Sequence, residues 1–241
     1  MSVLASRKVR LLESVPLSRE ARHFVFEALD QSSFDFEPGQ HICLRRDFDG
    51  KPVDRCYSIA SAPRGTNRLE LCIKSEPEGS PFGAHLSQMR PGDELEYRGP
   101  AGKFHLAAQP RDSIFVAVGT GITPLRSMLQ YWTATEGTQR QDRELTLILG
   151  AKDPERLYYS REFQTLADRR ANFRFWPTLS RPPESWTGRS GHAHQHLADA
   201  LRGRNSEVHV YLCGPKAMVE TAREQLSEAG LDDDAIFYEK F

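Results

Sequence analysis

The chain lacks the features of membrane-spanning and nucleic-acid-binding proteins. None of its 241 residues lies in an apolar run that approaches the roughly 18 residues of a membrane-spanning helix. The charges of its 32 basic and 33 acidic residues nearly cancel, so the protein has no large net positive charge that would attract it to nucleic acid or anionic lipid. Residues 1–10 carry positive charges with no long apolar core behind them. We therefore expect a cytoplasmic protein whose partners are small molecules or other proteins.

Cysteine is scarce as well, with no C-x-x-C pair among the widely spaced Cys43, Cys56, Cys72 and Cys213. This spacing argues against a zinc site and against an iron–sulfur cluster. The tract 191–196 holds three histidines, but His192 and His196 lack the carboxylate of an H-E-x-x-H frame. We interpret it as a polar helix start. The chain is thus expected to hold no metal, and any metal centre of its pathway would lie on another chain.

The first hundred residues show short apolar segments separated by turn residues, a pattern typical of a small antiparallel barrel. The expected strands are Lys8–Val15, Ala21–Ala28, His41–Arg46, Arg55–Ile59, Arg68–Lys74 and Glu94–Arg98. Turns are expected at the pairs Pro38–Gly39, Asp49–Gly50, Pro91–Gly92 and Gly99–Pro100. One helix near Phe82–Arg90 would interrupt the barrel.

From Ile114 onward, apolar strands alternate with helical segments, which indicates βαβ units around a parallel sheet. The expected strands are Ile114–Val118, Leu145–Leu149, Asn172–Pro177, Val208–Cys213 and Ala235–Tyr238. The expected helices are Leu125–Thr133, Arg161–Arg169, Gln195–Leu201 and Lys216–Ala229. The change of pattern falls in Ala107–Asp112, so we predict two domains, residues 1–108 and 109–241.

The strongest local signal of the second half is a strand that ends in G-x-G-x-x-P, from Gly119 to Pro124. The glycines allow a tight turn, and Pro124 suits the first helical position, where its missing N–H costs nothing. Backbone N–H groups at such a helix start can face a pyrophosphate. The alternative is a strand-to-helix turn with no ligand.

Two further segments offer binding chemistry. Cys213, Gly214 and Pro215 follow a strand, so they should line the crevice that Gly119–Pro124 opens at the carboxyl edge of the sheet. The alternative for Cys213 is a buried, inert thiol. In the first half, the segment Arg55–Ser58 combines a guanidinium for phosphate, a tyrosine ring for a flat ligand and a hydroxyl for a ring nitrogen.

Five motifs occur in one order: Arg55–Ser58, Gly99–Phe104, Gly119–Pro124, Cys213–Pro215 and Tyr238–Phe241. This set resembles the ferredoxin–NADP reductase superfamily, particularly the reductase parts of bacterial ring-hydroxylating and related oxygenase systems. The resemblance covers essentially the whole chain. It implies an N-terminal antiparallel β-barrel that binds FAD and a C-terminal α/β parallel-sheet domain that binds NADPH or NADH, with the two ring systems meeting between them.

The resemblance also implies roles in the barrel. Arg55 would bind the flavin pyrophosphate, Tyr57 would pack on the isoalloxazine, and Ser58 would lie near flavin N5. Ile73 and Lys74 match positions that flank the ribityl chain and pyrophosphate.

The helix start departs from the family pattern, because Gly83 stands where many relatives have Ser or Thr. The backbone N–H groups of Gly83 and Ala84 could still donate to the pyrophosphate, but we expect weaker FAD retention. The departure also leaves FMN as an alternative, although we favour FAD.

In the second half, Thr120, Gly121 and Cys213 would surround the nicotinamide, and Glu239 would lie close to nicotinamide and flavin. Catalytic roles are therefore assigned to Ser58, Cys213 and Glu239. The remaining expected nucleotide contacts are Gly119, Thr123, Pro124, Gly214 and Pro215.

Nucleotide choice depends on a third segment. Ser180 and Arg181 follow a predicted strand, and Arg189 comes soon after. The two arginines can clamp a 2′-phosphate, and no acidic residue at that strand end would take the 2′-hydroxyl of NAD. We therefore expect NADPH, with NADH as the alternative, because NADH-dependent members also carry this Ser-Arg pair. Phe241 either covers the flavin where the nicotinamide enters or simply ends the last strand.

The predicted activity is hydride transfer from NAD(P)H to bound FAD, followed by electron transfer to a separate protein, which is a ferredoxin, a flavodoxin or an oxygenase component. Two alternatives remain: a reductase of free flavin or quinone, and a regulatory subunit that binds flavin or nucleotide without turnover. We expect a monomer.

Overall fold

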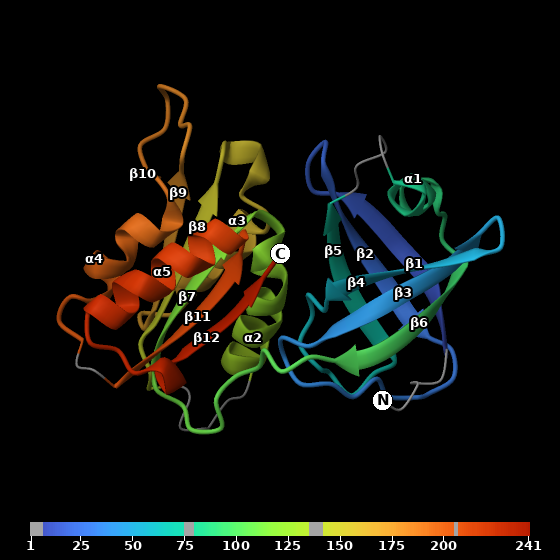
Figure 1. Cartoon of the computed structure of the whole chain (residues 1–241), viewed down its shortest axis with the longest axis horizontal. Coiled ribbons are helices and arrows are strands. Elements are labelled where there is room, and N and C mark those ends of the chain that lie inside the picture. The colour runs from blue at the N-terminus through green and yellow to red at the C-terminus, as the bar shows by residue number, and fades with distance from the viewer. Residues whose placement is uncertain (1–6, 75–79, 135–141, 205–206) are drawn as a thin grey trace. The chain divides into compact units, whose positions relative to one another are not determined.

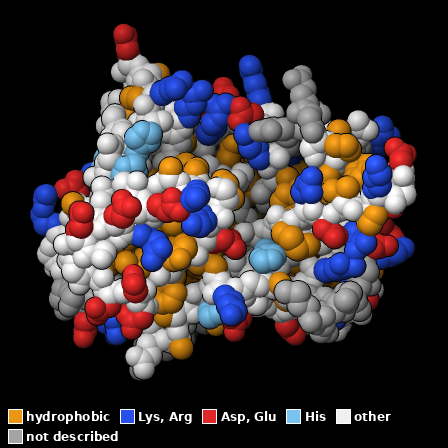
Figure 2. Space-filling model, in the orientation of Figure 1, with side chains coloured by type: hydrophobic (Ala, Val, Ile, Leu, Met, Phe, Trp, Pro, Cys, Tyr) orange, Lys and Arg blue, Asp and Glu red, His pale blue; other side chains and the backbone are white. Residues whose placement is uncertain are grey.

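The computed structural model describes residues 7–74, 80–134, 142–204 and 207–241, so residues 1–6 of the N-terminal segment lie outside it. The chain divides into two compact units (Figure 1). Unit 1 comprises Met1–Leu106 together with Arg126–Tyr131, and unit 2 comprises Ala107–Leu125 and Trp132–Phe241. Within the described residues, no helix is both long and apolar enough to cross a bilayer. Basic and acidic side chains are intermixed on the visible face of each unit (Figure 2).

Unit 1 is a six-stranded antiparallel sheet in the order β4-β3-β6-β1-β2-β5. Its strands are β1 (Arg7–Pro16), β2 (Ala21–Ala28), β3 (His41–Phe48), β4 (Lys51–Ser58), β5 (Arg68–Lys74) and β6 (Glu94–Ala101). An isolated bridge between Ile59, just after β4, and Leu71 of β5 joins the two ends of the sheet. The sheet therefore closes on itself like a barrel, which confirms the predicted fold class of the first half.

Alternating side chains fill the interior of unit 1. Phe24 and Phe26 of β2 and Ile42 and Leu44 of β3 are fully buried, while their neighbours in the strands are only partly covered. Helix α1 (Pro81–Gln88) adds two of its own side chains to this core. The period-two pattern is what one buried face of a strand requires.

Two sequence expectations for unit 1 are wrong. Strand β4 begins at Lys51, four positions before the expected start, because Asp49 and Gly50 adopt positive φ angles of 54° and 79° and form a tight hairpin that pairs β3 with β4 along its full length. The pair Gly99–Pro100 lies inside β6 and makes no turn.

Unit 2 is a parallel sheet in the order β10-β9-β8-β7-β11-β12. Its strands are β7 (Asp112–Val118), β8 (Leu145–Ala151), β9 (Phe173–Leu179), β10 (Arg189–Ser190), β11 (Val208–Gly214) and β12 (Ile236–Lys240). Its helices are α2 (Ile122–Ala134), whose middle groups with unit 1, α3 (Ser160–Arg169), α4 (Leu197–Leu201) and α5 (Lys216–Glu228). The predicted α/β fold class is confirmed.

Three local expectations for unit 2 need correction. Helix α2 begins at Ile122, so Pro124 is its third residue and not its first. The helix expected over Gln195–Leu201 is a 3₁₀ turn (Ala193–His196) that leads into the short α4. Ala235 ends another 3₁₀ turn, and β12 starts one residue later.

Candidate functional site

The strand order of unit 2 reverses between β7 and β11. From β7 the chain adds β8, β9 and β10 on one side, and β11 and β12 lie on the other. In sheets of this kind, the crevice at the carboxyl ends of the strands beside the reversal is where ligands bind. The residues 119–121 after β7 and 213–215 at the end of β11 occupy this position.

The turn after β7 packs directly against the end of β11. Gly119 has a positive φ of 58°, and a Cβ placed on Gly121 would collide with the backbone oxygen of Cys213. Only glycine at position 121 therefore lets the two backbones approach this closely. A Cβ on Gly119 would meet nothing within 4 Å, so space is open beside the turn.

Two side chains just after the turn, those of Thr123 and Pro124, are buried and point away from solvent. The Thr123 hydroxyl is buried and donates to the carbonyl oxygen of Thr120 at 2.7 Å. Pro124 is buried. Thr120 and Gly119 are partly exposed. Nucleotide contacts from this segment would thus come from its backbone and from Thr120, whereas Thr123 stabilises the turn.

Cys213 is almost completely buried and lies directly opposite Glu239 in the pairing of β11 with β12. Burial, helped by the Glu239 charge, raises the pKa of the Cys213 thiol well above its usual value. The thiol is therefore protonated at neutral pH and cannot act as a thiolate. Glu239 itself is partly exposed near the end of β12.

The C-terminus joins this edge through its backbone. The Phe241 N–H donates to the Gly214 carbonyl oxygen at 3.2 Å, and the Lys216 N–H donates to the Phe241 carbonyl oxygen at 3.2 Å. These two bonds hold the backbone of Phe241 in place. Its side chain is nevertheless 64% exposed.

A cavity of about 470 Å³ opens at the same edge of unit 2. It contains two of the predicted residues, Ser180 and Pro215. Its wall is tightly packed at Gly150, because a Cβ there would lie 2.9 Å from Ala193 Cβ. Its other lining residues are Val118, Gly150, Ala151, Lys152, Gly191, His192, Ala193, His194, Ala217, Met218 and Thr221.

Several of these lining residues were not predicted from the sequence. Gly150 is the last residue but one of the apolar strand β8 beside β7, and its place near a strand end was a signal for this edge. Lys152 follows two residues later. The tract 191–196 was considered as a metal site through His192 and His196 and interpreted as a polar helix start, yet the rings of His192 and His194 stack at 5.7 Å and line the cavity.

The two arginines proposed for a 2′-phosphate differ in their surroundings. The Arg181 side chain is exposed, and its backbone N–H donates to the Lys152 carbonyl oxygen at 3.0 Å, next to the cavity. The Arg189 guanidinium lies 3.9 Å over the Trp176 ring and 3.4 Å from Asp199. Arg181 is thus the freer of the two to meet a ligand phosphate.

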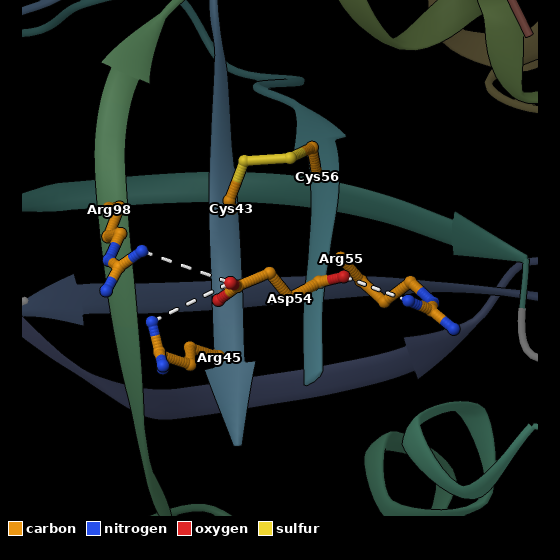
Figure 3. The surroundings of a disulfide bond; sticks show 6 residues. All are labelled: Cys43, Arg45, Asp54, Arg55, Cys56 and Arg98. Carbon is orange, nitrogen blue, oxygen red and sulfur yellow. Dashed lines mark hydrogen bonds and ion pairs between the residues drawn. A yellow bond between two sulfur atoms is a disulfide. The ribbon is translucent and has the colours of Figure 1, made fainter. Parts of the chain in front are cut away.

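In unit 1, Arg55 and Tyr57 share one face of β4. The Arg55 guanidinium is exposed and donates to the Asp54 carbonyl oxygen at 3.0 Å (Figure 3). Burial raises the pKa of Tyr57 to about 12, against the opposing effect of the Arg55 charge. The phenol therefore stays protonated and can donate a hydrogen bond. Ser58 is partly buried at the end of the strand, opposite His41 of β3.

The other predicted flavin contacts lie on β5 and α1. Ile73 is buried in the core and Lys74 is exposed at the end of β5. At the start of α1, the Gly83 N–H donates to the Ser80 hydroxyl at 3.4 Å and the Ala84 N–H donates to the Ser80 carbonyl oxygen at 3.0 Å. A phosphate contact from either N–H group would have to share or replace these bonds, and it stays a prediction.

Two of the four cysteines meet in space although 13 positions separate them in the sequence. Cys43 of β3 and Cys56 of β4 are directly opposite each other and form a disulfide (Figure 3). Cys72 and Cys213 are buried and lie outside this disulfide.

The residues present fit two dinucleotide cofactors. Unit 1 offers an exposed guanidinium beside a half-buried phenol, a combination suited to a phosphate and a flat ring. Unit 2 offers a cavity lined by residues at the carboxyl ends of its strands, beside the strand-order reversal.

Comparison with known proteins gives two matching family models. The oxidoreductase FAD-binding domain matches residues 8–106, and the oxidoreductase NAD-binding domain matches residues 115–224. Among curated proteins, the chain is 37% identical to ferredoxin–NADP reductase B of Sorangium cellulosum over 223 residues, which cover 90% of this chain and 89% of that protein.

Two further matches are partial in length. The chain is 32% identical to the anthranilate 1,2-dioxygenase electron transfer component of Acinetobacter baylyi over 86% of this chain, but spans only 58% of that protein. Among solved structures, the cytochrome P450 reductase GcoB of Amycolatopsis superimposes with a TM-score of 0.86 at 27% identity, covering 99% of this chain and 70% of that one.

Proposed function

Because the chain belongs to the ferredoxin–NADP reductase superfamily and is an FAD-dependent NAD(P)H oxidoreductase, we propose that it delivers electrons to a separate acceptor protein. The acceptor would be a ferredoxin, a flavodoxin or an oxygenase component. The observation that carries the nucleotide half of the proposal is the turn at Gly121, packed on Cys213 where the strand order reverses.

The proposed role of unit 1 is to bind FAD and to contact its isoalloxazine ring. Arg55 binds the pyrophosphate, Tyr57 covers the ring, and the Ser58 hydroxyl donates to its reactive nitrogen. Ile73 and Lys74 flank the ribityl chain. The protonated Tyr57 phenol supports this assignment because it can lie against an electron-rich ring without adding a negative charge.

The proposed work of unit 2 is to orient the nicotinamide nucleotide. The backbone from Gly119 to Gly121 faces the phosphates, Cys213 packs against the nicotinamide as a neutral thiol, and Glu239 supplies a nearby carboxylate. The cavity beside Ser180 and Pro215 would take the adenosine end. When bound, the two cofactors supply hydride transfer, and the protein supplies orientation and electrostatics. The proposed division is residues 1–108 for FAD and 109–241 for the nucleotide.

The relatives support a protein acceptor. One is named a ferredoxin–NADP reductase, another an electron transfer component of a dioxygenase, and a solved structure is named a cytochrome P450 reductase. Each name includes a second protein: a ferredoxin, a dioxygenase or a cytochrome P450. NADPH is the proposed donor, because the exposed Arg181 lies next to the cavity.

Anaerobic titration of the purified chain with NADPH and with NADH tests the proposal. We expect NADPH to bleach the flavin absorbance, and added ferredoxin, flavodoxin or an oxygenase component to restore it rapidly. Fast reduction followed by electron transfer only to free flavin or quinone would contradict a protein acceptor. A bound flavin that neither nucleotide bleaches would contradict turnover altogether.

A further inference from the structure

The disulfide between Cys43 and Cys56 stands at the outer side of the β3–β4 hairpin (Figure 3). Cys56 is exposed and Cys43 is partly buried, so solvent reaches the pair. Accessible disulfides exchange with thiols more readily than buried ones, because a thiolate must approach one sulfur. The position therefore permits both opening and closing of the bond.

The surroundings of the pair favour thiolate chemistry. A ring nitrogen of His41 and both sulfur atoms lie within 4.8 Å of one another. On the other side of β3, Arg98 of β6 is directly opposite Cys43 in the strand pairing. Asp54, whose carboxylate lies 4.0 Å from the Arg98 guanidinium and 3.7 Å from that of Arg45, balances part of this positive charge. A guanidinium or a protonated imidazole beside a cysteine stabilises its thiolate, the reactive form.

The bond also lies within the strand proposed to hold FAD. Cys56 stands between Arg55 and Tyr57, and its side chain lies on the opposite face of β4. In the described part of the chain, β4 pairs along its length with β3 and is the first strand in the sheet order β4-β3-β6-β1-β2-β5. The disulfide is thus a covalent cross-link in the ladder that positions the two proposed flavin contacts.

We propose that Cys43 and Cys56 form a reversible redox site whose reactants are thiols and disulfides of low molecular weight, and that closing the bond strengthens FAD retention. In the closing reaction, two cysteine thiols and one oxidised glutathione give the protein disulfide and two glutathione molecules. Two electrons pass from the protein to glutathione disulfide, and the two thiol protons end on the released glutathione thiols. The effect on FAD rests on the proposed function, whereas the exchange chemistry does not.

The test equilibrates the full chain in a series of reduced and oxidised glutathione buffers, quenches it with an alkylating reagent, and counts modified cysteines by intact mass and peptide mapping. We expect Cys43 and Cys56 to become protected together as the buffer turns oxidising, and to reopen on return. The Cys72→Ser variant is the matched control and should show the same transition, because Cys72 is buried elsewhere in unit 1. Cys43→Ser and Cys56→Ser should abolish it.

Flavin fluorescence on the same samples measures FAD dissociation from the wild-type chain in its two states. We expect the reduced chain to bind FAD about fivefold more weakly, and both single variants to match the reduced state in every buffer. Thiols that never pair, or a bond that persists in the reducing buffer, would overturn the redox site. A reduced chain that binds one Zn²⁺ and then resists oxidation would overturn it too, in favour of an imidazole–thiolate metal site.

Equal FAD affinity in the two states would overturn the link to flavin. A chain that binds no FAD in either state would contradict the proposed function and that link, while the cysteine counts alone still decide the redox site.

Discussion

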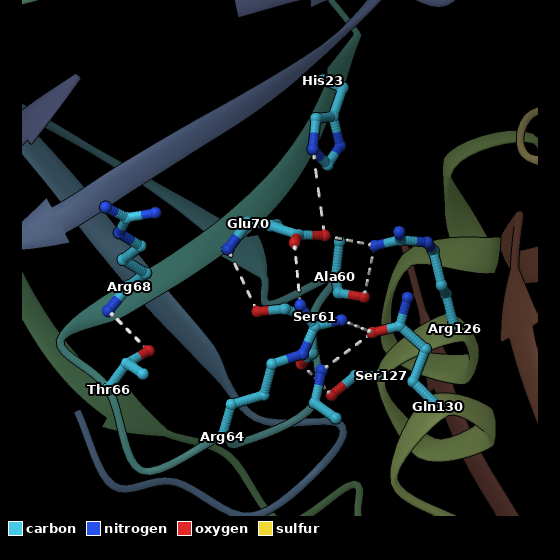
Figure 4. A network of polar contacts seen from close by, with 11 residues as sticks. His23, Ala60, Ser61, Arg64, Thr66, Arg68, Glu70, Arg126, Ser127 and Gln130 are labelled. Atoms are coloured by element: carbon cyan, nitrogen blue, oxygen red, sulfur yellow. Dashed lines mark hydrogen bonds and ion pairs between the residues drawn. The ribbon is translucent and has the colours of Figure 1, made fainter. Parts of the chain in front are cut away.

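The guanidinium of Arg126 and the carboxylate of Glu70 lie 2.6 Å apart, although 56 residues separate them in the chain (Figure 4). Their side chains are only 9% and 18% exposed. Arg126 also donates to the Ala60 carbonyl oxygen at 3.0 Å, and the neighbouring Ser127 hydroxyl donates to the Ser61 carbonyl oxygen at 2.6 Å. This network fastens the middle of α2 to β5 and the loop before it.

Replacing Glu70 by Gln should lower the free energy of unfolding by about 3 kcal/mol at pH 7, because the buried Arg126 charge loses its partner. Urea denaturation of the purified chain measures the effect. The double variant Glu70→Gln with Arg126→Met should recover part of the loss, since it leaves no unpaired charge. Additive losses in the double variant would contradict the coupling.

The ion pair of Arg126 with Glu70 also makes the free energy of unfolding depend on pH in the acidic range. Burial alone would raise the pKa of Glu70, but the charge and hydrogen bond of Arg126, with His23 and Arg64, outweigh it and lower the pKa below the usual 4.5. A lowered folded-state pKa gives stability that is present above the unfolded value and lost as pH falls through the folded value. Unfolding free energies measured from pH 6 downward should fall below about pH 4.5 in the wild type. Glu70→Gln should make this decline shallower.

His209 of β11 should make stability depend on pH in a higher range. Burial, helped by the Arg111 charge, lowers the pKa of His209 to about 4. The unfolded chain therefore binds a proton that the folded chain does not between about pH 6.5 and 4, and stability is lost as pH falls through this window. With solvent screening, we expect a loss of about 1 to 2 kcal/mol. Comparing wild type with His209→Gln at pH 7 and pH 5 isolates it; an equal loss in both chains would disprove the role of His209.

Gly121→Ala should abolish nucleotide binding or weaken it at least about tenfold, because the new Cβ would collide with the Cys213 backbone oxygen and push the turn out of place. Gly119→Ala is the matched control. It introduces no contact within 4 Å and costs only the strain of a φ of 58°, so we expect a smaller loss. Calorimetric titration with NADP⁺ measures both, and equal affinities would contradict the close-approach argument.

Arg181→Ala should raise KM for NADPH by about tenfold and leave KM for NADH within about twofold, since only NADPH carries the 2′-phosphate. Arg189→Ala should have a smaller effect on this ratio, because the Arg189 guanidinium is already stacked on Trp176 and paired with Asp199. Steady-state kinetics with both nucleotides measure the ratio. An unchanged ratio in Arg181→Ala would place the 2′-phosphate elsewhere or identify NADH as the donor.

Phe241→Ser should change nucleotide affinity or the preference between NADPH and NADH if the exposed ring covers the flavin. This substitution is a cleaner test than deleting the residue, because the backbone of Phe241 makes two hydrogen bonds, to Gly214 and Lys216. Kinetics and the flavin absorbance spectrum measure the result. If both are unchanged, Phe241 merely ends the chain beside β11.

Local patterning determined the elements. The bounds of β2 and β5 are those predicted from alternating side chains, and the helix of α5 was predicted to within one residue. The G-x-G turn after β7 was also predicted from its residues alone. Such features depend on contacts between neighbours in the chain, which periodicity and turn chemistry report directly.

Only the tertiary structure decided what distant segments do together. The collision that makes Gly121 indispensable involves a backbone 92 positions later, as the numbers 121 and 213 show. The disulfide depends on the register of the β3–β4 hairpin. A shift of one residue would have placed the side chains of Cys43 and Cys56 on opposite faces of the sheet. The pair of Arg126 with Glu70 joins two residues of unit 1 that lie 56 positions apart in the chain. Pairwise packing of this kind leaves no periodic trace in a single sequence, because it depends on where whole elements meet.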